Sequence, residues 1–154
     1  MTVTEIKRLL QEYPRLTAKI FDFGQDYRKL QEEKATFMVR YPQFSLESVR
    51  TANTNAVSDP TFEAVYGAVK DYDRHVERLA QCLQDCIRKK EYLESLFYCL
   101  DPIEFDVIDH YYFRGLRPNY ISMKLYISRA TFFRLKGIAV EKMANESEKG
   151  ENHG

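Results

Sequence analysis

Apolar residues recur three and four positions apart over two long stretches of the chain, residues 16–41 and 62–100. This alternation places the apolar side chains along one seam of a helix, as in a coiled coil. In each stretch a lysine occupies one of the apolar positions, Lys34 in the first stretch and Lys90 in the second. Such a lysine either sets the register or the oligomeric state of the helices, or it extends its ammonium group to water, and we favour the latter. The pattern predicts two long helices that pack seam to seam, within one chain or between two chains.

Prolines and capping residues give the bounds of these helices. Thr2 and Glu5 have the spacing of a capping box, and Pro14 should interrupt the helix that they begin. Ser58 or Asp59 caps the second long helix, and the preceding residues are rich in Ser, Thr, Asn and Asp, as is typical of a loop. The predicted elements are helices at about 3–13, 15–41 and 60–100, with a loop at 42–59.

Three shorter helices follow. Asp101 begins the first of them as a capping residue, and Gly115 ends it. Two further helices are predicted at about 118–125 and 129–144, joined by a tight turn, with Ser128 as the N-cap of the second. Two helices joined in this way are typical of a helix-turn-helix, whose second helix enters the major groove of DNA.

The end of the chain has a different composition. Residues 145–154 contain no apolar residue, so we expect a disordered tail. The predicted fold is therefore all-α. A long helical hairpin or coiled coil occupies residues 1–100, a helix-turn-helix domain occupies 101–144, and the tail follows.

The apolar positions of the shorter helices fit the interior of a helix-turn-helix. Ile121 and Leu125 face inward from the first helix, and Ile127 fills the gap after the turn. The buried stripe of the second helix is predicted to contain Phe132, Leu135 and Ile138 or Ala139. The opposite face of the second helix then carries basic and aromatic side chains that suit contacts with bases and phosphates.

Each residue type on that face suits one kind of contact. Arg129 is the candidate for bidentate hydrogen bonds to guanine, and Phe133 for contact with a thymine methyl group. The backbone N–H groups that follow Ser128 suit a phosphate, as do the basic side chains nearby. The candidate DNA-binding residues from this pattern are Ser128, Arg129, Ala130, Phe133, Arg134, Lys136, Arg117 and Lys124.

Charge is unevenly distributed along the chain. The 154 residues contain 23 basic and 23 acidic side chains, so the net charge is zero. Residues 114–143 nevertheless carry seven basic side chains and only Glu141 as an acid, whereas residues 101–113 carry four acids and no base. A phosphate backbone would bind the basic segment. The acidic helix either keeps its own face away from phosphates or contacts RNA polymerase.

Other classes of protein are disfavoured. No apolar run approaches the ~20 residues that span a bilayer, and no signal peptide is visible, so we expect a cytoplasmic protein without membrane contact. Cys82 and Cys86 lie four residues apart on one helix, but a metal site would need further ligands, and Cys86 belongs to the apolar seam, which favours a place in the core. Asp106 and His110 share a helix face, but no catalytic motif accompanies them. We therefore expect no enzyme activity and no cofactor.

Residues 100–143 resemble a known family. The segments Tyr-Tyr-Phe-Arg-Gly-Leu (111–116) and Ile-Ser-Met-Lys-Leu-Tyr-Ile-Ser-Arg-Ala-Thr-Phe-Phe-Arg (121–134) are similar to region four of bacterial sigma factors. They are more similar to phage transcriptional regulators of the ArpU and RinA type, which also carry a long helical N-terminal half. The resemblance implies sequence-specific binding to double-stranded DNA and activation of late phage genes. It also implies that the recognition-helix positions are Ser128, Arg129, Ala130, Thr131, Phe133 and Arg134. The family usually has glycine at the position of Tyr126, so we expect a looser turn or another backbone path there.

Three functions follow as hypotheses. The first is a phage or prophage transcriptional regulator that dimerises through its long helices and binds two half-sites. The second is a sigma-like factor that acts through RNA polymerase, although no promoter-melting segment is visible in the N-terminal half. The third is a DNA-packaging assembly protein like a small terminase subunit, in which the DNA-binding motif usually precedes the oligomerising helices.

Overall fold

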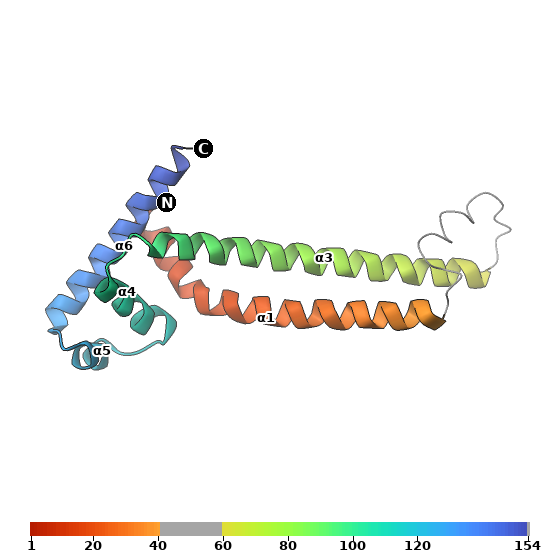
Figure 1. Cartoon of the computed structure of the whole chain (residues 1–154), viewed down its shortest axis with the longest axis horizontal. Helices are drawn as coiled ribbons and strands as arrows, with labels where there is room; N and C mark the ends of the chain where they lie inside the picture. The colour runs from red at the N-terminus through yellow and green to blue at the C-terminus, as the bar shows by residue number, and fades with distance from the viewer. Residues whose placement is uncertain (41–59, 154) are drawn as a thin grey trace. The chain divides into compact units, whose positions relative to one another are not determined.

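The computed structural model describes residues 1–40 and 60–153, which form helices and short connections (Figure 1). No β-strand occurs in these two ranges, which confirms the predicted all-α fold class. None of the helices in them is long and apolar enough to cross a membrane. The predicted loop at 42–59 and the predicted cap at Ser58 or Asp59 lie outside the described residues.

The helices fall into two compact units. The elements are α1 (Val3–Arg40), α3 (Pro60–Phe97), α4 (Pro102–Ile108), a π-helix η3 (Asp109–Phe113), α5 (Pro118–Leu125) and α6 (Arg129–Glu151). Unit 1 combines Met1–Ala18 with Cys86–Gly154, and unit 2 comprises Lys19–Asp85. The division falls inside α1 and α3, so it differs from the predicted domain boundary at residue 100.

Unit 2 is a helical hairpin in which the later part of α1 and the earlier part of α3 lie side by side (Figure 1). The ring of Phe37 lies 5.8 Å from that of Tyr72, centroid to centroid, and the ammonium group of Lys34 forms an ion pair with Asp73. The two seams therefore pair within the chain. Because Lys34 joins the two helices, it favours one register, which corrects our expectation that its ammonium group reaches water.

Unit 1 has a core built from both ends of the chain. Its buried residues come from the first turns of α1, the end of α3, α4 and the later half of α6, and they are Ile6, Leu10, Leu93, Leu96, Ile108, Ala139, Val140, Met143 and Ala144. These helix ends each bury one apolar stripe against the others. The first residues of the predicted coiled coil therefore belong to the same core as the end of the predicted DNA-binding domain.

The structure corrects the predicted break at Pro14, because α1 continues through this residue from Val3 to Arg40. A proline inside a helix removes one backbone hydrogen bond and crowds the carbonyl group four residues earlier. Leu10 and Leu16, on either side of Pro14, are both buried in unit 1. Their burial favours the helical path and offsets the local cost of the proline.

The structure also corrects the expected disorder of residues 145–154, because α6 continues to Glu151. Ser147 is 2% exposed, and its hydroxyl group accepts a hydrogen bond of 2.9 Å from the Met1 nitrogen. The same hydroxyl donates to the Ala144 carbonyl oxygen at 2.7 Å. Composition alone predicted disorder because a segment without apolar residues adds little to a core. Here the polar side chain of Ser147 instead bonds to Met1, two residues before α1 begins.

A hydrogen bond of Tyr13 joins α1 to α3 within unit 1. Its hydroxyl group donates to the Glu94 Oε1 atom at 2.8 Å, and the Lys90 Nζ atom lies 2.8 Å from the same oxygen. The ring of Tyr13 packs against those of Phe97 and Phe113. Burial, together with the bond to Glu94, raises the pKa of Tyr13 to about 12 from an ordinary value of 10.0.

Unit 1 should therefore lose stability in alkali. A tyrosine with a raised pKa in the folded state contributes stability that is present below pH 10 and is lost as the pH rises toward 12. The loss follows because the unfolded chain ionises first. We expect Tyr13→Phe to be less sensitive to pH between 10 and 12 than the wild type, as measured by chemical denaturation followed by circular dichroism. Tyr98→Phe is the control, since that side chain is 92% exposed. Equal pH dependence in all three proteins would contradict the assignment.

Candidate nucleic-acid interface

Two helices and a short turn form the motif that the sequence predicted. Helix α5 begins at Pro118, whose missing N–H group is harmless in a first turn, and ends at Leu125. Helix α6 begins at Arg129 after the N-cap Ser128. The two helices are therefore joined by only three residues, 126–128.

A small apolar cluster holds the motif together. Val107 from α4, Ile121 from α5 and Phe132 from α6 are each 0% exposed. The partly buried residues around them are Tyr111, Leu116, Leu125, Ile127 and Leu135. The inward positions predicted for the helix-turn-helix are therefore confirmed, and Ala139 rather than Ile138 is the fully buried residue further along α6. This packing fixes which face of α6 remains outside.

The turn keeps the path that glycine would favour, although it carries tyrosine. Tyr126 has φ 56° and ψ 41°, in the left-handed region. Its N–H group donates to the Met123 carbonyl oxygen at 3.4 Å, and the Ile127 N–H group donates to the Ser122 carbonyl oxygen at 3.0 Å. This pair of bonds is the Schellman arrangement that ends many helices. The resemblance led us to expect a looser turn or another path, and the structure has a compact turn with a strained residue.

Substitution of this tyrosine tests the strain. Tyr126→Gly should raise the free energy of unfolding by about 1 kcal/mol, because a side chain in the left-handed region costs ~1–2 kcal/mol that glycine avoids. Little burial is lost, since Tyr126 is 96% exposed. Chemical denaturation measures the change. Tyr126→Ala is the control, because alanine also has a side chain and so retains the strain of the left-handed region. Its free energy of unfolding should remain close to that of the wild type.

Ser128 prepares the start of α6. Its Oγ atom accepts a hydrogen bond of 3.1 Å from the Thr131 N–H group and donates one of 2.8 Å to the Thr131 hydroxyl oxygen. The N–H groups of Arg129 and Ala130 have no partner among the described residues. Because the N-terminus of a helix carries partial positive charge, these two groups are suited to bind a phosphate oxygen.

Three side chains form a basic and aromatic surface on α6. The guanidinium carbon of Arg129 lies 5.6 Å from the ring centroid of Phe133, and the Lys136 Nζ atom lies 5.5 Å from the same ring. Phe133 is 43% exposed, whereas its neighbour Phe132 is 0% exposed. Lys136 also lies over the ring of Tyr111, at 4.2 Å, so its ammonium group is held against aromatic faces.

The other predicted residues surround this surface on the same motif. Arg134 and Ala130 are exposed on α6, Arg117 is exposed immediately before α5, and Lys124 is exposed in its last turn. The five basic side chains predicted to meet DNA make no ion pair within the described part of the chain, and they are Arg117, Lys124, Arg129, Arg134 and Lys136. The sequence from Gly115 to Val140 contains no acidic residue. Positive charge is therefore left without local compensation here.

Two other basic residues of the segment are used inside the fold. The Lys142 Nζ atom lies 2.8 Å from the Glu104 Oε1 atom and 3.5 Å from the Asp101 Oδ2 atom. Hydrogen bonding to Glu104 raises the pKa of Lys142. The Arg114 Nε atom lies 3.1 Å from the Asp109 Oδ2 atom. The basic charge that faces solvent is therefore smaller than the segment's composition suggests.

These ion pairs also change the view of the acidic helix. Three of the four acids at 101–113 are paired, and Asp106 alone has no ion pair with a described residue. Glu104 is 4% exposed, and it also accepts a hydrogen bond of 2.9 Å from the Asp101 N–H group. The acids therefore fix α4 against α6 and the turn after η3, and they do not form a continuous acidic face.

The sequence analysis did not predict that Tyr111 contacts Lys136, or that apolar residues of α5 are exposed. Tyr111 lies 25 positions before Lys136 and in another element, so no local pattern could show their contact. Tyr120 is 55% exposed and Met123 is 77% exposed. Their positions opposite the buried Ile121 and Ser122 on the helical wheel would have signalled their exposure.

The Nδ1 atom of His110 lies 2.6 Å from the backbone oxygen of Asp106, so the one acid–histidine pair that the sequence suggested does not join side chains. Within residues 1–40 and 60–153, no group of three or more potential ligands is placed to hold a metal ion. No protein-family model matches the chain, and no curated protein or solved structure shows significant similarity to it.

Proposed function

We propose that this protein binds double-stranded DNA in a sequence-specific way through α6, as a transcriptional regulator of a phage or prophage. The observation that carries the proposal is the contrast between adjacent residues of α6. Phe132 is fully buried beneath α5, whereas Arg129 and Phe133 are exposed at the start of the same helix, in a segment without acids. The resemblance of residues 100–143 to phage regulators supports the regulatory part.

The start of α6 can enter a major groove, which admits one α-helix. In that position Arg129 donates two hydrogen bonds to a guanine, and Phe133 contacts the methyl group of a thymine. Arg117, Lys124 and Arg134 lie outside this pair and bind phosphates, which position the helix without reading sequence. Lys136 adds positive charge from its site over Tyr111.

The decisive experiment is selection of bound duplexes from a random DNA library with the purified full chain. We expect enrichment of one short motif that contains a guanine. Affinity for the selected duplex should exceed that for a scrambled duplex by ~10³-fold or more at physiological salt. Equal affinity for both duplexes would contradict sequence-specific binding. Affinity should also fall with added salt, since phosphate contacts release counterions.

The regulatory part has its own test. We expect the selected site to lie near a promoter, and the protein should change transcription from that promoter in a purified reaction with RNA polymerase. Binding of DNA without polymerase is expected. A protein that binds DNA only together with polymerase would instead be a sigma-like factor.

A further inference from the structure

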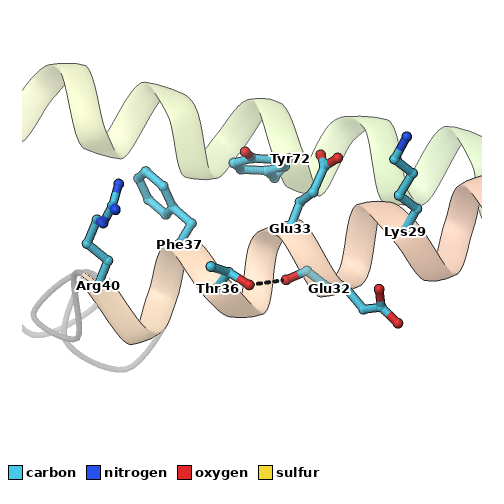
Figure 2. A pocket seen from close by; sticks show the side chains of 7 residues that line it. All are labelled: Lys29, Glu32, Glu33, Thr36, Phe37, Arg40 and Tyr72. Carbon is cyan, nitrogen blue, oxygen red and sulfur yellow. Dashed lines mark hydrogen bonds between the residues drawn. The ribbon is translucent and has the colours of Figure 1, made fainter.

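One face of unit 2 carries a continuous groove between its two helices. A depression of about 500 Å³ near the end of α1 is shown in Figure 2, where the side chains of Lys29, Glu33, Phe37 and Arg40 extend from α1 toward α3. A second depression of about 360 Å³ shares Lys29 and Glu33 with the first, so the two adjoin. The groove has apolar side chains along its length, and they are Leu30, Phe37, Tyr72 and Leu79.

The hairpin does not bury its own seam. Among the described residues of unit 2, Val69 alone is buried, at 4% exposed, and the other apolar residues of the seam are only half-buried. A helix stripe that stays partly open to water is normally covered by another layer of helices. Since α1 and α3 already pair with each other, a further layer has to come from outside the hairpin.

We propose that a second copy of this chain covers the groove, so that two hairpins form a four-helix bundle. The described part of α1 in unit 2 has a length of about 33 Å, and two helices side by side have a width of about 20 Å. Such a face covers roughly 650 Å², close to the ~800 Å² that each partner buries in a specific dimer. The inference does not rest on DNA binding.

The charges along the groove identify a second copy as the occupant. On the face of α1 that carries the groove, two pairs of charged residues at equal distances from position 31 have opposite charges, Lys29 with Glu33 and Asp22 with Arg40. Arg28 and Lys34 are also equally distant from position 31 and are both positive, but they line neither depression. A two-fold axis across α1 at this position therefore places Lys29 of one copy opposite Glu33 of the other, twice. A symmetric dimer needs this pattern, because the same surface must be complementary to itself.

Opposite charges are also placed symmetrically on α3, and their centre lies at nearly the same position along the hairpin. Asp71 and Arg78 have opposite charges and are equally distant from the point between residues 74 and 75. The contacts of Phe37 with Tyr72 and of Lys34 with Asp73 place position 31 level with residues 76 to 78. The two centres of charge symmetry thus agree to about 2–5 Å along the hairpin, which is at most one helical turn. One axis satisfies both helices, with α1 antiparallel to α1 of the second copy.

A charge exchange tests the arrangement in the full chain. Lys29→Glu brings carboxylates of the two copies together at both symmetric positions, so we expect the dimer dissociation constant to rise about tenfold or more. Adding Glu33→Lys to the same chain restores opposite charges across the axis, and the dissociation constant should return to within about threefold of the wild type. Sedimentation equilibrium measures each value, starting from a wild-type mass of twice the 18.2 kDa chain.

Arg28→Glu is the matched control. Arg28 is adjacent to Lys29 and also has a glutamate four residues later, Glu32, so both substitutions remove the same kind of pair within α1. Arg28 does not line the depressions that contain Leu30, Phe37, Tyr72 and Leu79, so its substitution should leave the dissociation constant unchanged. Circular dichroism checks that every variant remains helical. A monomeric wild type at 0.1 mM would overturn the proposal, as would a double variant as weak as Lys29→Glu, or equal weakening by Arg28→Glu.

Discussion

Phe132→Ala is expected to lower the free energy of unfolding of unit 1 by about 3–5 kcal/mol, the range for deletion of a buried aromatic side chain. Phe132 is 0% exposed and lies with Val107 and Ile121 in the cluster that holds α5 on α6. Its loss leaves a cavity in this cluster, and surrounding side chains usually relax into such a cavity only in part. Chemical denaturation followed by circular dichroism measures the change. Because α5 then loses its support, affinity for the selected DNA should fall as well.

Phe133→Ala is the matched control at the next position. Phe133 is 43% exposed, so its removal should cost about 1 kcal/mol of stability or less. Its effect should instead appear in DNA binding, as a loss of affinity of roughly tenfold with the fold intact. If the two substitutions had equal effects on stability, the assignment of the inner and outer faces of α6 would be wrong.

Arg129→Ala is expected to reduce the preference for the selected duplex over a scrambled one by roughly 10–100-fold. A bidentate contact between arginine and guanine contributes ~1–3 kcal/mol of discrimination, and no neighbouring side chain replaces it. Arg129 is exposed at the first position of α6, with its guanidinium group beside Phe133. Electrophoretic mobility shifts with both duplexes at one salt concentration measure the ratio. Stability should change by less than ~0.5 kcal/mol, since the side chain is on the surface.

Two controls separate recognition from charge. Arg8→Ala removes an arginine whose side chain is 71% exposed on α1, and it should alter neither affinity nor preference. Lys124→Ala removes a proposed phosphate contact, so it should weaken binding to both duplexes and reduce the salt slope by about 0.9. A uniform loss of affinity in Arg129→Ala, with the preference retained, would assign Arg129 to a phosphate instead.

The sequence predicted the helix-turn-helix residue by residue because its signals are local. Apolar spacing identified Ile121 and Phe132 as interior, and Ser128 was identified as a cap from its residue type and position. Each of these properties depends on neighbours within about one turn of the same helix. The turn itself was less predictable, because the strain at Tyr126 is offset by the packing of both flanking helices.

The charge of the interface was only partly predictable. The sequence showed an excess of basic residues at 114–143, but it did not show that Lys142 and Arg114 pair with acids of the preceding helices. Lys142 meets Glu104 across 38 positions of sequence. Only the packing of α4 against α6 brings those two side chains together, and it leaves the basic residues of α5 and the start of α6 exposed.

By itself the sequence determined the all-α class, the two long amphipathic helices, and the buried and exposed faces of the motif at 118–144. Periodicity and capping decide these features within one helix. The tertiary structure decided the continuity of α1 through Pro14, the extension of α6 to Glu151 and the pairing of the seams within the chain. Each of these depends on contacts between residues distant in sequence. The free energy gained by burying Leu10 and Leu16, or by bonding Ser147 to Met1, appears only when the two ends of the chain meet.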